Sequence, residues 1–306
     1  MKNRVTEEMK QEIISRLGLA KETEIIEQDV QKNNGLVLHG VAIRESGTSI
    51  SPTIYIDDVE DERIVSYLVD VYMKNRKDLP FNLKEMFSRE SILAKVQPVL
   101  VNREKNEELL KSVPSRWFAG DLAIIYKVII EDLGGNASVT IKNDLMEKEN
   151  LSEEELYENA LKNLDDKIVV NSMYDTMKKT LLDDCMTRFP DMSTDELDKV
   201  VKDMMVMSGA GEEDTTLTVI TNKNKYFGAA SILDNATLME LRDTFDSDFY
   251  ILPSSIHEVI VVPTSKGDDV EQFRDMVREV NDTQVAPDEI LSYNVYLYSN
   301  GKVFVA

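Results

Sequence analysis

The sequence predicts an α+β protein with largely antiparallel sheets that are covered by helices. Three observations support this prediction. Short strand-like segments alternate with amphipathic helical segments along most of the chain. Asn-Gly pairs at 34–35 and 300–301 each lie between two strand-like segments, a pattern typical of tight hairpin turns. An acidic block at 143–214 interrupts the alternation and has helical periodicity.

Residues 1–142 are predicted to form an N-terminal α+β unit. The expected elements are a helix at 5–17 that ends at Gly18, a hairpin formed by 23–30 and 36–43, a strand at 52–57, a helix at 64–72, and strands at 96–101, 121–130 and 138–141. Trp117, flanked by Arg116 and Phe118, is interpreted as a core residue, because large aromatic side chains dominate the packing of cores.

Residues 143–214 are predicted to form an acidic, methionine-rich helical insert. The block has 20 Asp and Glu against 8 Lys and Arg, and it holds 8 of the 14 methionines. Ser152 with Glu155 and Ser193 with Glu196 have the spacing of capping boxes, which predict helix starts. The methionines are interpreted as gap-filling core residues, with an adaptable partner-binding surface as the alternative. A polar stretch at 208–214 marks the end of the block.

Residues 215–306 are predicted to form a C-terminal α+β unit, which alternatively belongs to one continuous fold with 1–142. The expected elements are a strand at 216–221, a helix capped by Asn235, strands at 249–252 and 256–262, a helix at 270–280, and a closing hairpin formed by 293–298 and 302–305.

The charge, the apolar segments and the cysteine content of the chain argue against several kinds of function. The net charge of -22 repels phosphates, and no basic patch is visible, so no direct nucleic-acid binding is expected. No apolar segment suits a signal peptide or a membrane span, and the only cysteine, Cys185, has no partner for an internal disulfide. These features predict a cytoplasmic protein. No glycine-rich segment has a P-loop or dinucleotide-fold context, and no cofactor is expected.

Ser255, His257 and Glu258 are the candidate catalytic residues, since serine, histidine and a carboxylate are the parts of a nucleophilic triad. On a strand at 256–262, His257 and Glu258 would point to opposite faces. Ser255 and His257 would lie roughly 6.5 Å apart along the strand, which is too far for direct proton transfer. The favoured interpretation of His257 is therefore a hydrogen-bonded structural residue, with catalysis as the alternative.

His39, Asp57 and Asp58 are the candidate metal ligands. His39 alternates with apolar residues on one face of its predicted strand, which is typical of a core position. Asp57 and Asp58 end a predicted strand, where carboxylates are held firmly enough to bind Mg²⁺. The alternative is that the two carboxylates lead into the next helix and complement its dipole. No His-x-x-x-His or two-histidine carboxylate spacing accompanies them, so no metal is predicted.

Several motifs along the chain resemble a bacterial family of unknown function. They include 33–40, 50–56, 114–118 and 121–126, followed by the C-terminal signatures Leu-Pro-Ser-Ser-x-His-Glu-Val at 252–259 and Val-Asn-x-Thr-Gln-Val-Ala-Pro at 280–287. The resemblance spans nearly the whole chain. It implies a cytoplasmic bacterial protein, with a mobile element or phage as one origin, and it supplies no catalytic residues. Residues 171–214 are longer and richer in methionine than the family pattern.

Three hypotheses of function follow. The first is a non-enzymatic module that binds another protein through its adaptable acidic insert. The second is a hydrolase or transferase that uses Ser255, His257 and Asp57. The third is an acidic mimic of nucleic acid, motivated by the net charge of -22. The sequence sets neither a substrate nor an oligomeric state.

Overall fold

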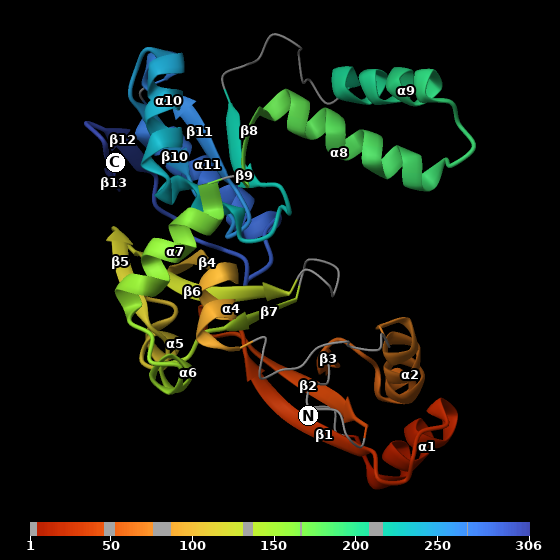
Figure 1. Cartoon of the computed structure of the whole chain (residues 1–306). Coiled ribbons are helices and arrows are strands. Elements are labelled where there is room, and N and C mark those ends of the chain that lie inside the picture. Colours follow the sequence, from red (N-terminus) through yellow and green to blue (C-terminus); the bar gives the residue numbers. More distant parts are fainter. Residues whose placement is uncertain are drawn as a thin grey trace. The chain divides into compact units, whose positions relative to one another are not determined.

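The computed structural model describes residues 5–45, 53–75, 87–130, 137–165, 167–207, 217–267 and 269–306. It divides into two compact units, Met1–Ser91 and Ile92–Ala306 (Figure 1). Every strand pairing in the described parts is antiparallel, and helices accompany the sheets in both units, so the predicted α+β class is confirmed. Among the described helices, none has the length and apolar character to cross a bilayer.

The first unit is a three-stranded sheet in the order β1-β2-β3, accompanied by two helices. Its elements are α1 (Glu7–Leu17), β1 (Glu24–Gln31), the 3-10 turn η1 (Asn33–Gly35), β2 (Val37–Arg44), β3 (Thr53–Tyr55), η2 (Asp61–Arg63) and α2 (Ile64–Asn75). The predicted opening helix, hairpin, third strand and second helix are confirmed. The hairpin turn has Asn34 and Gly35 at positive φ, which these two residue types tolerate best.

Helix α1 begins at a Thr6 cap, which was not predicted, and ends at Gly18 as predicted. The Thr6 hydroxyl accepts a hydrogen bond from the Met9 amide, and Gly18 adopts the left-handed conformation with φ of 62°. The apolar sides of α1 and α2 pack with the sheet into a core of their own, which includes Ile13, Val41, Ile54, Ile64 and Leu68. This unit therefore has a buried core independent of the rest of the chain.

The second unit begins with a four-stranded sheet centred on β6. This part of the chain starts with α4 (Arg89–Lys95), which spans the boundary at 91/92, and continues with β4 (Val96–Asn102), α5 (Glu107–Leu110), β5 (Ser115–Ala119), β6 (Leu122–Ile130), β7 (Ala137–Thr140), α6 (Asn143–Lys148) and α7 (Glu153–Asp165). Strand β6 pairs with β4 along one edge and with β5 and then β7 along the other. Eight of its nine residues are buried, because the sheet is covered on both faces at this strand.

A six-stranded sheet completes the second unit, in the order β13-β12-β10-β11-β9-β8. Its elements are β8 (Ile168–Ser172), α8 (Met173–Arg188), α9 (Thr194–Met207), β9 (Thr218–Asn222), η4 (Gly228–Leu233), α10 (Asn235–Phe245), β10 (Phe249–Leu252), β11 (Val259–Pro263), η5 (Thr264–Lys266), α11 (Val270–Thr283), β12 (Tyr296–Ser299) and β13 (Lys302–Val305). The predicted closing hairpin is confirmed, with Asn300 and Gly301 at positive φ.

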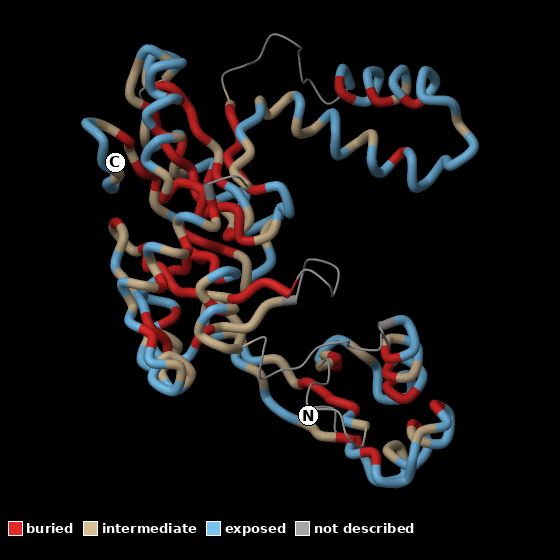
Figure 2. The backbone as a smooth tube through the Cα atoms, in the orientation of Figure 1, coloured by how far each residue is buried: buried red, intermediate tan, exposed pale blue. Residues whose placement is uncertain are grey.

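One large core joins the two sheets of this unit. It combines residues of the first sheet, such as Leu100 and Ile124, with residues of the second, such as Ile220 and Tyr296. Figure 2 accordingly shows buried residues in the strands of both sheets. A smaller cluster under α11 includes Phe273 and Val277. The amphipathic pattern predicted for 270–280 is confirmed, since these two side chains are buried while Glu271 and Glu279 are exposed.

The acidic block contains more than helices. Helices α7 and α9 begin at the two predicted capping boxes, in which Glu155 and Glu196 bond back to Ser152 and Ser193. Between them lies β8, which enters the six-stranded sheet. Helix α7 also packs into the large core through Leu156 and Ala160. The expected boundaries at 142/143 and 214/215 remain predictions, while the compact units divide at 91/92.

Three local predictions were wrong. Trp117 is 61% exposed rather than buried, because β5 lies at a sheet edge and directs this side chain outward. Strand β11 begins at Val259, so His257 precedes the strand and the argument from alternating faces does not apply to it. The N-cap of α10 is Asp234, whose side chain accepts a hydrogen bond from the Thr237 amide, and Asn235 is the first helical residue.

Candidate functional site

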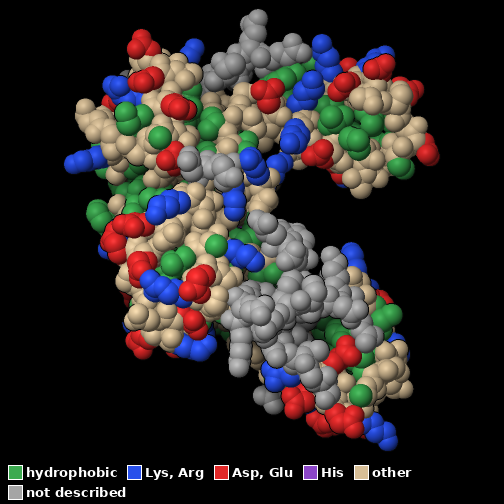
Figure 3. Space-filling model, viewed as in Figure 1, with side chains coloured by type: hydrophobic (Ala, Val, Ile, Leu, Met, Phe, Trp, Pro, Cys, Tyr) green, Lys and Arg blue, Asp and Glu red, His purple; other side chains and the backbone are tan. Residues whose placement is uncertain are grey.

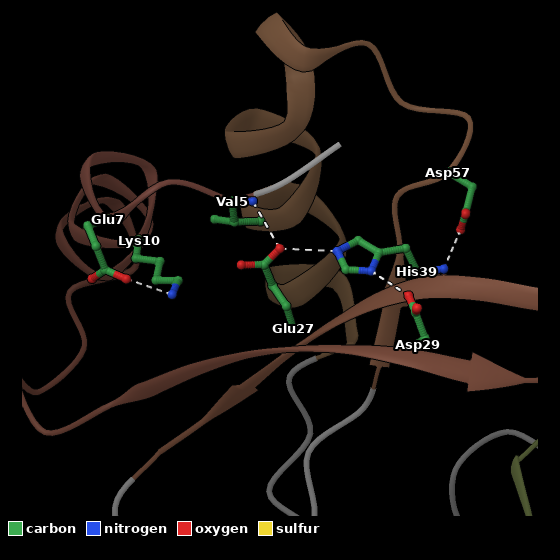
Figure 4. A network of polar contacts seen from close by, with 7 residues as sticks. All are labelled: Val5, Glu7, Lys10, Glu27, Asp29, His39 and Asp57. Atoms are coloured by element: carbon green, nitrogen blue, oxygen red, sulfur yellow. Dashed lines mark hydrogen bonds and ion pairs between the residues drawn. The ribbon is translucent and has the colours of Figure 1, made fainter. Parts of the chain in front are cut away.

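His39 lies on β2 between two carboxylates of β1 (Figure 4). Its Nδ1 is 3.0 Å from Asp29 Oδ1, directly across the ladder, and its Nε2 is 3.1 Å from Glu27 Oε2. The hydrogen bond with Asp29 is the main cause that raises the pKa of His39, and Glu27 adds to the effect. The arrangement therefore favours the imidazolium, in which both ring nitrogens donate.

The His39 network also ties three segments of the first unit together (Figure 4). Glu27 Oε2 accepts a hydrogen bond of 3.1 Å from the Val5 amide, just before α1. The His39 amide donates to Asp57 Oδ2 over 2.8 Å, and the Ile56 amide donates to the His39 carbonyl over 3.1 Å. Asp57 thus fastens the segment after β3 to β2. The network thus links β1, β2 and the segments that precede α1 and follow β3.

The three candidate metal ligands have different surroundings. Asp57 bonds to the backbone of His39, whereas Asp58 is exposed at the turn after β3. Among the described residues, these three included, no group of three or more His, Cys, Asp or Glu side chains is placed to hold a metal ion. Both ring nitrogens of His39 are already engaged, by Asp29 and by Glu27.

His257 lies on the turn that precedes β11. Its Nδ1 accepts a hydrogen bond of 3.2 Å from the Phe227 amide, and its Nε2 is 3.3 Å from Glu289 Oε1. Nδ1 acts as an acceptor in this arrangement, so the Phe227 amide occupies its lone pair. Both ring nitrogens are therefore committed to partners in the fold.

Ser255 and Glu258 do not complete a triad around this imidazole. The Ser255 hydroxyl accepts a hydrogen bond of 3.0 Å from the backbone amide of His257, not from its ring. Glu258 is exposed, and Glu289 takes the place beside the imidazole. A general base needs one nitrogen within reach of the nucleophile, and neither nitrogen of His257 is free for that role.

The loop between β9 and η4 holds His257 in place. Phe227 adopts φ of 58°, which is uncommon for a bulky residue, and this conformation presents its amide to the imidazole. Tyr226 and Phe227 stack on the His257 ring with centroid distances of 5.5 and 5.9 Å. The Asn222 side chain closes the loop with hydrogen bonds to the Tyr226 carbonyl and amide. The strained turn is thus held by structural hydrogen bonds.

A buried polar network around Asp121 was missed by the sequence interpretation. The Asp121 carboxylate accepts hydrogen bonds from Asn102 Nδ2 over 2.6 Å, from the Ser292 hydroxyl over 2.9 Å, and from the Tyr296 hydroxyl. Asn102, Ser292 and Tyr296 are all buried, and burial raises the pKa of Tyr296. The network joins the first sheet to the C-terminal segment. Its members are far apart in sequence, so no local pattern signals it.

Helices α8 and α9 form a hairpin with a small core of its own. The buried residues are Cys185, Leu197, Val201 and Met205, and they form a cluster separate from the large core. Five large apolar side chains of the hairpin segment are exposed: Met186 at 54%, Phe189 at 48%, Met204 at 40%, Val206 at 68% and Met207 at 88%. Figure 3 shows hydrophobic side chains open to solvent on this hairpin.

Part of the exposed apolar surface forms one row on α9. Val200, Met204 and Met207 follow one another at spacings of four and three residues, so they share one side of the helix. Val200 is partly buried against the hairpin core, and exposure rises along the row to Met207. We call these three residues the α9 row. The interpretation of the methionines as gap-filling core residues therefore holds for Met205, whereas Met204 and Met207 are exposed.

The comparison with protein families supports the resemblance inferred from the motifs. The chain belongs to a family of unknown function, DUF5688, whose model matches residues 2–300. No curated protein and no solved structure matches the chain.

Proposed function

We propose that this member of a family of unknown function is a protein-interaction module whose docking element is the α8–α9 hairpin. The observation that supports the proposal is the exposure of five large apolar side chains on a hairpin with only four fully buried ones. Exposed apolar side chains that share one side of a helix, as in the α9 row, mark interaction sites more often than single ones do. Methionine suits such a surface because its flexible thioether adapts to irregular shapes.

The chemistry of the hairpin favours a cationic amphipathic helix as the partner segment. Two antiparallel helices with a small shared core are half of a helical bundle, and a further helix laid along the α9 row would cover it. The chain carries a net charge of -22, and the hairpin itself has 8 Asp and Glu against 5 Lys and Arg. Opposite charge on the partner would speed and orient the encounter.

The proposal is tested with a synthetic amphipathic helix of leucine and lysine, whose binding to the full-length chain is followed by fluorescence anisotropy. A scrambled peptide of the same composition serves as the probe of net charge alone. The expected result is that the amphipathic peptide binds more tightly than the scrambled one. Replacing Met204 and Met207 together by Glu should weaken binding about tenfold or more, as loss of apolar anchors does in other interfaces.

The control variant is Met73→Glu, on α2 in the first unit, since Met73 is 59% exposed and lies outside the hairpin. It adds one negative charge, half of what the double variant adds, which should leave binding of a cationic peptide unchanged or slightly stronger. The double Met204 and Met207 variant must therefore weaken binding despite becoming more acidic. Equal binding of the scrambled peptide, or equal loss in Met73→Glu, would contradict the proposal.

The hydrolase or transferase alternative rests on Ser255 and His257 and has a direct test. A fluorophosphonate probe labels a serine only when a neighbouring base activates it. We expect no labelling of Ser255, because the His257 ring bonds to Phe227 and Glu289 instead. Labelling of Ser255 that is lost in His257→Gln would favour the enzyme hypothesis over the interaction hypothesis.

The third hypothesis, an acidic mimic of nucleic acid, has less support than the interaction hypothesis or the enzyme hypothesis. A mimic needs carboxylates in a continuous row spaced like phosphates, whereas acidic and basic side chains are interspersed on the face drawn in Figure 3. Pairs such as Arg188 with Asp184 and Arg116 with Glu153 and Glu154 also neutralise part of the acidic surface.

A further inference from the structure

In the described part of the chain, β13 is the outer strand at one end of the six-stranded sheet. This strand pairs with β12 through the two-residue turn Asn300-Gly301, and β12 continues the sheet on its other side. The Ala306 amide donates to the Val295 carbonyl over 2.9 Å, so the backbone of Ala306 points toward β12. Because hydrogen-bonding direction alternates along an antiparallel strand, the backbone groups of Val303 and Val305 point away from β12. Neither has a backbone partner within the described part of the chain.

The side chains along this edge do not protect it from pairing. In natural proteins, charged side chains, a proline or a β-bulge usually prevent an edge strand from pairing with another chain. Here Val303, Phe304 and Val305 are consecutive apolar residues, and the only charge on the strand is Lys302, next to the turn. Phe304 is 45% exposed and Val305 is 39% exposed. Since side chains alternate faces, Phe304 lies on one face of the edge and Val305 on the other.

Trp117 extends the apolar surface on the Val305 side. Its indole Nε1 donates to the Gly120 carbonyl over 3.1 Å, which satisfies its one polar group and leaves a ring that is 61% exposed. Gly120 lies against Val305, since a Cβ at this glycine would be 2.5 Å from Val305 Cγ2. Trp117 and Val305 therefore flank the same glycine. Figure 3 shows hydrophobic side chains gathered where β5 and β13 adjoin.

We infer that the edge of β13 binds an extended segment of a partner protein, which adds to the sheet as a further strand with Trp117 as its apolar anchor. The outward backbone groups of Val303 and Val305 would supply up to about four ladder hydrogen bonds. Alternate side chains of the added strand would pack on Phe304 and on the surface of Trp117 and Val305. An occupant with alternating apolar residues in an extended conformation fits both features. This site is independent of the hairpin.

The test begins with selection of binders for the full-length chain from a phage-displayed library of random peptides. Selected peptides are synthesised, and their affinities are measured for the unmodified chain and for variants. Trp117→Ala removes the exposed ring, and Val303→Pro removes an outward donor while leaving the hydrogen bonds to β12 in place. Either change should weaken binding about tenfold or more if the edge is the site. Thermal unfolding by circular dichroism verifies that both variants fold.

Tyr67→Ala is the matched control, because Tyr67 is an exposed aromatic residue of α2, at 38%, and lies outside both the edge and the α8–α9 hairpin. Peptides bound at the edge should keep their affinity for this variant and for the double Met204 and Met207 variant. Hydrogen exchange adds a direct readout, since a bound strand should slow exchange of the Val303 and Val305 amides. A negative result in the test of the α8–α9 hairpin would not change these measurements at β13. Each of the two proposals can therefore be disproved without the other.

Two outcomes would overturn the inference. One is that every selected peptide binds Trp117→Ala and Val303→Pro as tightly as the unmodified chain. The other is that the chain sediments as a dimer that Val303→Pro dissociates, which would make a second copy the occupant of the edge instead of a partner protein. The inference is supported if the selected peptides have alternating apolar residues and slow the exchange of the Val303 and Val305 amides. The chain must also sediment as a monomer.

Discussion

Asp29 and His39 face each other across the β1–β2 ladder, with Asp29 Oδ1 3.0 Å from His39 Nδ1. The pair is a cross-strand ion pair only while the imidazole is protonated. Glu27, two residues before Asp29 on the same face of β1, occupies the other ring nitrogen. The stability of the first unit should therefore depend on the charge of one histidine.

The first prediction concerns the pH dependence of this unit. The pKa of His39 is raised above its ordinary value of 6.5, so the folded state binds a proton more tightly than the unfolded state. The resulting stabilisation is fully present below about pH 6.5 and is lost as the pH rises through the folded pKa. His39→Gln should thus destabilise the unit by about 1 kcal/mol at the acidic end and by less above the folded pKa.

Titration of the imidazole C–H resonances by nuclear magnetic resonance measures this effect directly. His257→Gln assigns the two resonances, because the chain has 2 histidines. Asp29→Asn removes the main cause of the raised pKa and should lower the titration point of His39. A midpoint for His39 at or below the ordinary histidine value would disprove the prediction.

Much of the fold followed from local signals in the sequence. The Asn34-Gly35 and Asn300-Gly301 turns, the Gly18 cap and the capping box at Ser193 are all formed as expected. Each depends on backbone preferences within a few residues, which sequence alone reports. Strand β8 was missed because its residues lie inside a strongly acidic block, and its pairing with β9 depends on a partner about fifty residues away.

The surroundings of the candidate residues were harder to predict. His257 was expected to face neighbours along a strand, but Phe227 and Glu289, from distant parts of the chain, bind its ring. Trp117 was expected in the core because of its size, yet the edge position of β5 exposes it. Tertiary contacts decide these cases, and neither periodicity nor composition reports which strand lies at an edge.

A second prediction concerns the Asp121 network. Asp121→Asn replaces one carboxylate oxygen by an amide nitrogen, which cannot accept the hydrogen bonds from Asn102, Ser292 and Tyr296 together. Leaving a buried donor unsatisfied should destabilise the second unit by about 1–3 kcal/mol. Urea unfolding followed by the fluorescence of the single tryptophan measures this, since Trp117 lies in the same unit.

The control for this substitution is Asp243→Asn. The side chain of Asp243 is 79% exposed and lies 3.9 Å from Arg242, so its loss should change stability by less than about 0.5 kcal/mol. Equal unfolding midpoints for Asp121→Asn and the unmodified chain would show that the network contributes nothing measurable.

A third prediction uses Cys185 as a reporter of the hairpin. Its thiol is 3% exposed and belongs to the small core of α8 and α9, so a thiol reagent reaches it when the hairpin opens. Ser193→Ala removes the cap of α9, which costs about 1 kcal/mol and should speed labelling about fivefold. Ser152→Ala removes the equivalent cap of α7 and should leave the rate unchanged. Equal acceleration by both would mean that labelling reports global unfolding.

The last prediction concerns the close packing of Gly228 beneath the His257 turn. A Cβ at this position would lie 2.3 Å from Thr221 Oγ1, 2.5 Å from the His257 carbonyl oxygen and 2.7 Å from the Asn222 amide nitrogen. Two of these atoms belong to the backbone and cannot move aside cheaply, so Gly228→Ala should destabilise the second unit by about 1–3 kcal/mol.

At Gly267 the nearest atom is Phe273 Cζ at 3.4 Å, an ordinary contact, and the backbone is extended. Gly267→Ala should therefore be tolerated, and urea unfolding of the two variants tests the contrast. A Gly228→Ala chain as stable as Gly267→Ala would mean that the loop between β9 and η4 can shift away from the turn, and that the Phe227 amide is not held against the His257 ring.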